Sequence, residues 1–174
     1  KMKLIEKNKS IIPAIDFDDH KKLTDILTAG AENQLIGAYK IGFVLGLTYG
    51  LPEIVDTIRG FDATTPIIYD HQKCGTDIPA TGKAFAKVCK GAGVDSVIIF
   101  PQAGPDTQEA WIKACQDQDL HVITGGMMTH PNYLATRKEM EKVTDSKYLT
   151  GGYLRPDAPY DMYNLSYALG VRDF

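Results

Sequence analysis

The stretch of residues 66–82 reads Pro-Ile-Ile-Tyr-Asp-His-Gln-Lys-Cys-Gly-Thr-Asp-Ile-Pro-Ala-Thr-Gly. Its short apolar run is typical of a buried strand and stops abruptly at Asp70. Lys73 and Asp77 follow, and a helix-like segment begins at Asp77. Three charges of alternating sign between a buried strand and a helix are costly unless they pair or act chemically. The stretch therefore indicates either a salt-bridged loop or a functional site at the end of a strand.

Apolar runs and helical spacing alternate through the rest of the chain. The runs typical of buried strands cover residues 10–17, 36–44, 65–69, 95–101 and 121–124. Helices are predicted after Asp19, from Gly50, after Asp77, and over residues 106–117, 132–143 and 159–170. The helix after Asp77 is expected to bury one side, made of Ile78, Phe85, Val88, Cys89 and Ala92. Residues 171–174 resemble the start of a sixth strand.

Buried strands that alternate with amphipathic helices indicate a parallel sheet, either open or closed into a barrel. Polar residues follow several strands at their carboxyl ends, where both sheet types place their sites: Asp16, Lys40, Asp70, Lys73 and Thr129. No Gly-x-Gly-x-x-Gly follows the first strand, which disfavours a dinucleotide-binding fold. A (β/α)8 TIM barrel usually needs at least about 200 residues. The 174 residues therefore predict a single α/β barrel domain over 1–174 that covers five to six strands and apparently lacks its C-terminal strands.

Composition excludes several classes of protein. The net charge of −3 gives no basic surface of the kind that nucleic-acid binding requires. No apolar run approaches the roughly 18 residues that span a bilayer, and no signal peptide opens the sequence. The cysteines form an odd set of three without metal-ligand spacing: Cys74, Cys89 and Cys115. We expect reduced thiols in a cytoplasmic protein that binds neither nucleic acid nor membrane.

Several short motifs resemble those of the orotidine 5′-phosphate decarboxylase family. Lys40-Ile41-Gly42 matches the family's Lys-[Ile/Val]-Gly strand, and residues 70–81 are similar to its Asp-x-Lys-x-x-Asp-Ile-Pro-x-Thr signature. Residues 128–131 resemble its Met-Ser-His-Pro segment, with Thr129 in place of Ser. Asp16 corresponds to the Asp that closes the family's first strand. The matches occur in the family's order and cover nearly the whole chain.

One departure from the family's pattern concerns spacing. Two residues instead of one separate Asp70 from Lys73, and three instead of two separate Lys73 from Asp77. Residues three apart on a regular strand lie on opposite faces, so Asp70 and Lys73 converge only if a bulge or an early strand end re-aims one of them. Gly75 would permit a kink in the second gap. The two residues of the first gap are either loop residues or substrate contacts: His71 and Gln72.

The resemblance implies conversion of orotidine 5′-phosphate to UMP and CO2 in de novo pyrimidine biosynthesis, without metal or cofactor. Loss of CO2 from C6 of the pyrimidine leaves a carbanion that the ring π system does not delocalise. Lys73 is expected to stabilise this charge with its ammonium and then to protonate C6. Asp70 is expected near the departing carboxylate, where it holds Lys73 charged. Lys40 is expected to neutralise Asp70 and to contact the ribose.

The resemblance also implies a homodimer with shared sites. Asp77 would complete a Lys-Asp-Lys-Asp row by reaching across the interface into the neighbouring site, together with Ile78 and Thr81. Asp16 would accept a hydrogen bond from a ribose hydroxyl, and Thr129 would bond the pyrimidine edge. The family's phosphate-binding residues would lie beyond Phe174.

Other interpretations of the same residues stay open. A Mg2+-dependent sugar-phosphate decarboxylase or aldolase of the same suprafamily would share the Asp/Lys/Asp row. A non-catalytic nucleotide-binding barrel would bind without chemistry if Lys73 is displaced. Lys40 could instead extend to a strand edge, and Asp77 could cap the helix that follows it.

Overall fold

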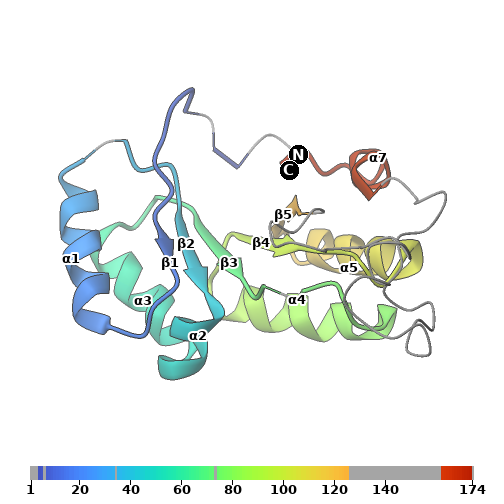
Figure 1. Cartoon of the computed structure of the whole chain (residues 1–174), viewed down its shortest axis with the longest axis horizontal. Helices are drawn as coiled ribbons and strands as arrows, with labels where there is room; N and C mark the ends of the chain where they lie inside the picture. Colours follow the sequence, from blue (N-terminus) through green and yellow to red (C-terminus); the bar gives the residue numbers. More distant parts are fainter. Residues whose placement is uncertain (1–3, 6, 34, 73, 126–161, 174) are drawn as a thin grey trace, which may run out of the picture.

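The computed structural model describes residues 4–5, 7–33, 35–72, 74–125 and 162–173. Within these residues, five strands form one sheet in which every neighbouring pair is parallel: β1 (Ala14–Ile15), β2 (Tyr39–Gly42), β3 (Ile67–Asp70), β4 (Ser96–Ile99) and β5 (His121–Thr124). The helices are α1 (His20–Ala31), α2 (Phe43–Tyr49), α3 (Leu51–Phe61), α4 (Gly82–Gly91), α5 (Pro105–Asp117) and α7 (Met162–Ala168) (Figure 1). A short 3-10 helix, η1 (Pro79–Thr81), precedes α4.

Strand order identifies the sheet as part of a barrel. In an open doubly wound sheet the order reverses at a switch point, whereas here it runs from β1 to β5 without reversal. Ile123 of β5 also forms a parallel bridge with Asp173, so the chain after α7 continues the sheet beyond β5. The helices pack in the same sequence, α1 on α3, α4 on α5 and α5 on α7 (Figure 1). The structure confirms the predicted fold class as a partial (β/α) barrel.

The two faces of the sheet differ because successive side chains of a strand alternate between them. The face that contacts the helices carries the hydrophobic core, where strand residues are nearly or fully buried: Ile15, Ile41, Tyr69, Val97 and Ile99. Strand pairing places Ala14, Lys40 and Ile68 side by side on the opposite face. Charged residues at the strand ends therefore emerge on the face that the helices do not cover.

Caps and glycines determine where the first helices start. Asp19 caps α1, and its carboxylate accepts hydrogen bonds from the backbone N–H groups of Lys21 and Lys22 at 2.9 and 3.1 Å. Gly50 has a φ of 87°, which glycine adopts without strain, and it turns the chain from α2 into α3. The helix then buries residues at helical spacing: Ile54, Val55 and Ile58. Both helix starts agree with the predicted ones.

The first two strands are shorter than predicted. Residues 10–17 contribute only Ala14–Ile15 as a strand, with one further bridge between Ile11 and Ile36. Pro13 interrupts the pairing because it has no N–H for a sheet hydrogen bond. The second strand ends at Gly42, and α2 begins inside the predicted strand. α7 lies within the predicted helix 159–170, whereas the predicted helix 132–143 falls outside the described residues.

The predicted buried side of α4 is wrong at two positions. Val88 is 67% exposed and Ile78 is 61% exposed. The helix begins at Gly82, later than predicted, and Ile78 therefore lies outside its periodicity. Val88 precedes the buried Cys89 by one residue, about 100° around the helix, and so faces outward. The remaining predicted positions pack in or against the core: Phe85, Cys89 and Ala92.

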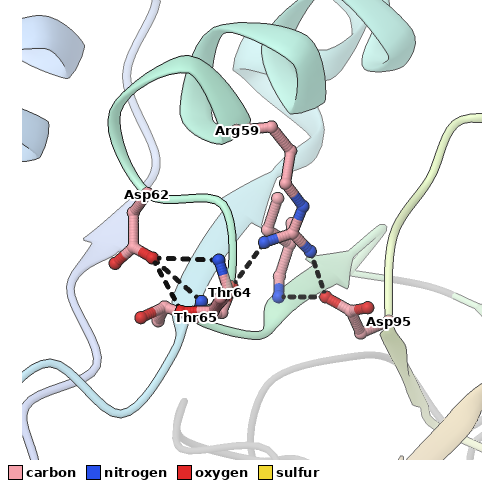
Figure 2. Close-up of polar contacts among 6 residues, drawn as sticks. Arg59, Asp62, Thr64, Thr65 and Asp95 are labelled. Atoms are coloured by element: carbon pink, nitrogen blue, oxygen red, sulfur yellow. Dashed lines mark hydrogen bonds and ion pairs between the residues drawn. The ribbon is translucent and has the colours of Figure 1, made fainter.

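An ion pair joins the sheet to α3 at the amino ends of β3 and β4 (Figure 2). Arg59 Nη2 lies 2.5 Å from Asp95 Oδ2, and Arg59 Nη1 donates to the Thr65 carbonyl at 2.7 Å. The same Asp95 oxygen accepts a hydrogen bond from the backbone N–H of Ile67 at 2.8 Å. Hydrogen bonds to Asp62 close the turn before β3, as Figure 2 shows. These contacts tie α3, β3 and β4 together at the end of the sheet away from the carboxyl ends.

Candidate active site

Three predicted site residues come together at the carboxyl ends of β1, β2 and β3. Lys40 lies on β2, Asp70 is the last residue of β3, and Asp16 follows β1. Lys40 Nζ lies 3.0 Å from Asp70 Oδ2 and 3.3 Å from Asp16 Oδ2. The side chains of Lys40 and Asp70 are 20% and 12% exposed, so this pair is largely withdrawn from water. One ammonium thus bridges two carboxylates on neighbouring strands rather than extending to a strand edge.

Strand register explains why these side chains meet. Ala14 pairs with Lys40, and Gly42 pairs with Asp70. Paired residues of parallel strands point to the same face, as do residues two apart on one strand. Asp16, Lys40 and Asp70 therefore share the face that the helices leave uncovered.

Gly42 leaves the space that the Asp16 carboxylate occupies. A Cβ added at Gly42 would overlap Asp16 Oδ1 and would lie 3.2 Å from Asp16 Cγ. The missing side chain lets Asp16 lie against β2, within reach of Lys40. In the sequence, Gly42 is visible only as the last residue of the Lys-[Ile/Val]-Gly motif. Its contact with Asp16 depends on the pairing of β1 with β2, which no local pattern reports.

The surroundings of Lys40 keep its ammonium protonated. Partial burial acts to lower the pKa of Lys40, but the hydrogen bond and charge of Asp70, followed by those of Asp16, outweigh it. The pKa of Lys40 is therefore raised above its ordinary value. At neutral pH the ammonium provides a fixed positive charge between two acidic side chains.

The chain leaves β3 through a tight turn directly after Asp70. Asp70 Oδ1 accepts a hydrogen bond from the backbone N–H of Gln72 at 3.0 Å. Gln72 has a φ of 64°, in the left-handed region that is uncommon for residues other than glycine. The early strand end that the spacing of Asp70 and Lys73 calls for is therefore present. Lys73 itself lies outside the described residues, as does Thr129.

The chain after residue 73 is attached to the end of β4. The Phe100 N–H donates to the Cys74 carbonyl at 2.7 Å. Gly75 has a φ of 85°, and a Cβ there would lie 2.5 Å from Ile99 Cγ2. Gly75 thus provides the kink expected in the second gap, at a position that also excludes a side chain. The residues on either side of position 73 are thus held through their main chain: the Gln72 N–H by the Asp70 side chain, and the Cys74 carbonyl by the Phe100 N–H after β4.

His71 packs on the helix side of this loop rather than against Lys40. Its Nδ1 lies 2.7 Å from Tyr69 Oη, and its ring centroid lies 6.2 Å from that of Phe85. Burial, more than any nearby charge, raises the pKa of Tyr69 to about 12, so the hydroxyl keeps its proton at neutral pH. The geometry favours the interpretation of His71 as a loop residue.

Asp77 and Ile78 are not among the contacts of the Lys40 cluster in the described part of the chain. In the part of the chain that the structure describes, Lys40 forms ion pairs with the carboxylates at 16 and 70 and not with Asp77. Asp77 Oδ1 accepts a hydrogen bond from the Ile78 N–H at 2.8 Å, and both residues are exposed. The N-cap position of α4 belongs to Thr81, so the prediction that Asp77 caps this helix is wrong. Thr81 closes the turn by donating its hydroxyl to the Ile78 carbonyl at 2.8 Å.

All three cysteines are buried, and none of them is paired in a disulfide in the structure. Burial raises the pKa of each thiol, for Cys89 and Cys115 to about 12, which makes them poor nucleophiles at neutral pH. Within the described ranges, no group of three or more His, Cys, Asp or Glu side chains is arranged to hold a metal ion. None of the described helices combines the length and apolar character needed to cross a bilayer.

Fold and site together define the class of protein: a (β/α) barrel whose first three strands end in an Asp-Lys-Asp cluster at the carboxyl edge. The model of the Orotidine 5'-phosphate decarboxylase / HUMPS family matches residues 9–152, and the chain belongs to this family. The resemblance seen in the motifs is thereby confirmed. A comparison with curated proteins found no match.

Solved structures share this fold. The orotidine 5'-monophosphate decarboxylase from Methanocaldococcus jannaschii complexed with inhibitor BMP is 26% identical, with a TM-score of 0.61 over 71% of this chain and 54% of that chain. A second structure of that decarboxylase is 21% identical, with a TM-score of 0.67 over 94% and 68% of the two chains. The 3-keto-L-gulonate-6-phosphate decarboxylase from Vibrio cholerae O1 biovar El Tor is 16% identical, with a TM-score of 0.52 over 76% and 56%. The chain thus spans about half the length of the first of these structures, and the latter two show the fold alone.

Proposed function

We propose that the protein decarboxylates orotidine 5′-phosphate to UMP and CO2, a step of de novo pyrimidine biosynthesis, without metal or cofactor. The observation that carries the proposal is the Lys40 ammonium between the carboxylates of Asp16 and Asp70 at the carboxyl ends of three neighbouring strands. The family match and the 26% identical decarboxylase from Methanocaldococcus jannaschii support it.

The reaction breaks the bond between C6 of the pyrimidine and its carboxylate carbon. CO2 leaves, the electron pair of the bond stays on C6, and a proton must then be added there. We assign this proton to the Lys73 ammonium, which also stabilises the carbanion electrostatically before the transfer. Lys73 then recovers its proton from water.

Asp70 is assigned to the position beside the departing carboxylate, where it holds Lys73 charged. Lys40 bonds one oxygen of Asp70, and the Gln72 N–H bonds the other. Because both oxygens are engaged, the carboxylate has little freedom to rotate, which suits electrostatic preorganisation. A second ammonium, from Lys73, would balance the excess negative charge of the cluster.

The remaining roles on this side of the site concern binding. Asp16 accepts a hydrogen bond from a ribose hydroxyl, and Lys40 contacts the same sugar. Thr129, which follows β5, bonds the pyrimidine edge. These assignments follow the family's pattern, and the exposed carboxylate of Asp16 supports the first of them because a ligand can reach it.

We further propose a homodimer in which Asp77, Ile78 and Thr81 enter the site of a second copy. Exposure supports this role, since Ile78 is an apolar side chain that is 61% exposed in the single chain. Asp77 then supplies the last charge of the Lys-Asp-Lys-Asp row from the neighbouring subunit.

The test is consumption of orotidine 5′-phosphate by the purified protein, followed by its ultraviolet absorbance. Lys73→Ala is expected to abolish turnover nearly completely while UMP binding stays measurable by calorimetry. Lys113→Ala is a matched control, because Lys113 is an exposed lysine on α5 that pairs only with Glu109 among the described acidic residues. Normal turnover by Lys73→Ala would overturn the assignment of the proton donor. UMP binding without turnover by the unaltered protein would favour a non-catalytic nucleotide-binding barrel.

A second candidate is a Mg2+-dependent sugar-phosphate decarboxylase or aldolase of the same suprafamily. This candidate is supported by the fold that the chain shares with the 3-keto-L-gulonate-6-phosphate decarboxylase from Vibrio cholerae. Carboxylates such as Asp16 and Asp70 are ligands that Mg2+ prefers, but both are paired with Lys40 here. This candidate would be supported over the first if the protein did not consume orotidine 5′-phosphate but converted a sugar phosphate, and if chelation of Mg2+ abolished that conversion.

A further inference from the structure

The segment that carries Asp77 and Ile78 is attached to α5 through its main chain. Thr107 Oγ1 donates to the Asp77 carbonyl at 3.0 Å, and Trp111 Nε1 donates to the Ile78 carbonyl at 3.1 Å. Thr107 and Trp111 are 3% and 5% exposed. The donors are therefore buried on α5, whereas the side chains of Asp77 and Ile78 stay exposed.

The exposed side chains of residues 77–80 bury little surface in this attachment. Residues 76–80 are all exposed, and η1 is a single 3-10 turn, a structure that is marginal on its own. Asp77 and Ile78 also border an open hollow of about 370 Å³. Because exposed side chains contribute little packing energy, the hydrogen bonds from α5 carry much of the attachment.

Close packing at the start of α4 directs the indole. A Cβ at Gly82 would lie 2.9 Å from Trp111 Cγ and 3.0 Å from Trp111 Cα. The ring also lies against Phe85, with 5.1 Å between centroids. The indole is therefore held between α5 and the start of α4, and its N–H has a defined direction toward the Ile78 carbonyl.

We propose that Thr107 and Trp111 are positioning residues, which hold Asp77 and Ile78 in the geometry that the decarboxylation site needs. The inference rests on the proposed function, in which Asp77 completes the site of a second copy. A displacement of about 1 Å in a catalytic group can cost a large factor in rate. A main-chain anchor suits this task because it directs Asp77 while the carboxylate stays available to the substrate.

Two conservative substitutions remove the donors one at a time. Trp111→Phe keeps an aromatic ring without the N–H, and Thr107→Val keeps the shape without the hydroxyl. Each loses one hydrogen bond, so we expect kcat/KM to fall about fivefold for each variant and about twentyfold for the double variant. Thr107→Ser retains the hydroxyl and is expected to keep the original activity. Gln116→Met is the matched control, because it removes a 2.8 Å bond to the Leu169 carbonyl from the other end of α5.

Hydrogen exchange of peptides that span residues 76–82 measures the anchor without any activity. Trp111→Phe and Thr107→Val are expected to speed exchange in this segment about fivefold, and Gln116→Met is expected to leave it unchanged. Unchanged exchange in both variants overturns the anchor, and faster exchange with undiminished kcat/KM overturns the positioning role. If the unaltered protein does not consume orotidine 5′-phosphate, the proposed function fails, whereas faster exchange in the variants still supports the anchor.

Mixing variant subunits separates positioning from general damage. A dimer of Trp111→Phe with Lys73→Ala has one site that combines an intact Lys73 with an intact Asp77 segment from the other chain. We expect the mixture to be about threefold more active than the two proteins kept apart. No gain on mixing would overturn a role for Trp111 in the neighbouring site.

Discussion

The Lys40 ammonium lies 3.0 Å from Asp70 Oδ2, although the two residues are 30 positions apart in the chain. The pair exists because β2 and β3 are parallel neighbours whose register places both side chains on one face at the carboxyl edge. At the amino ends of the sheet, Asp95 pairs instead with Arg59 and ties β3 and β4 to α3 (Figure 2). In barrels of this kind the carboxyl edge serves chemistry and the amino edge serves stability.

Lys40→Met is expected to lower the free energy of unfolding by about 3 kcal/mol, because it leaves the carboxylate of Asp70 withdrawn from water without its cationic partner and, among the described residues, with only the Gln72 N–H as a hydrogen-bond donor. Adding Asp70→Asn should recover most of this loss. Urea unfolding of the double-mutant cycle is expected to give a coupling energy of about 1–3 kcal/mol. The double-mutant cycle of Lys40 with Asp16 should give a smaller coupling energy, because the Asp16 side chain is 39% exposed. Equal coupling in both cycles would contradict the geometry.

Gly42→Ala is expected to destabilise the protein by about 1–3 kcal/mol, because the new Cβ overlaps the Asp16 carboxylate. Displacement of Asp16 should also raise KM more than it lowers kcat, since Asp16 is assigned to ribose binding. Gly60→Ala is the matched control, because no atom apart from the neighbouring backbone of its own helix lies within 4 Å of a Cβ there. Gly60 lies inside α3, so its replacement should stabilise the protein by about 0.5–1 kcal/mol. Similar changes in stability for the two variants would argue against the close contact.

Mixing Lys73→Ala with Asp77→Ala tests the shared site of the proposed homodimer. Each variant alone is expected to be nearly inactive. In half of the random dimers one of the two sites receives an intact Lys73 and an intact Asp77, so activity should return to about a quarter of the original value. Absence of recovery, with dimers demonstrated by light scattering, would place Asp77 outside the neighbouring site.

Asp95→Ala is expected to lower stability by about 1–2 kcal/mol, because it removes the acceptor for Arg59 and for the Ile67 N–H. The loss stays modest since the Asp95 side chain is 40% exposed. Lys21→Ala breaks only an exposed pair on α1 and should cost less stability than Asp95→Ala does. Urea unfolding measures both, and kcat/KM of the folded Asp95→Ala protein should be unchanged. A large loss of kcat would contradict the purely structural role of the amino end.

Stability is expected to fall as the pH rises above 9.0. Burial raises the pKa of the Cys89 and Cys115 thiols from 9.0 to about 12. The two neutral thiols therefore contribute their full stabilisation below pH 9.0. As the pH rises from 9.0 to about 12 this contribution is lost, because the unfolded chain releases thiol protons that the folded chain retains. Each contributes a slope of about 1.4 kcal/mol per pH unit. In Cys115→Ala the free energy of unfolding, measured with urea at several pH values above 9.0, should fall with pH less steeply by about this amount. Equal slopes for the variant and the unaltered protein would contradict the burial of the thiol.

Much of the fold followed from apolar periodicity, because strands and helices leave local patterns in the chain. The α3 helix and β5 lie where their apolar residues predicted them. The α4 helix shows the limit of such reasoning. Its buried side was assigned from Asp77 onward, but η1 delays the helix to Gly82 and leaves Ile78 outside its periodicity. Val88 faces outward because it lies about 100° around the helix from the buried Cys89.

The sequence by itself determined the alternation of strands and helices, the resemblance to the family and the identity of the charged residues. These are properties of short segments and of their order along the chain. Only the tertiary structure decided that Lys40 bridges Asp16 and Asp70, that Gly42 leaves the space for Asp16, and that α5 anchors the Asp77 segment. Each of these contacts joins residues from different elements. They depend on strand register and helix packing, which act over distances that no local pattern records.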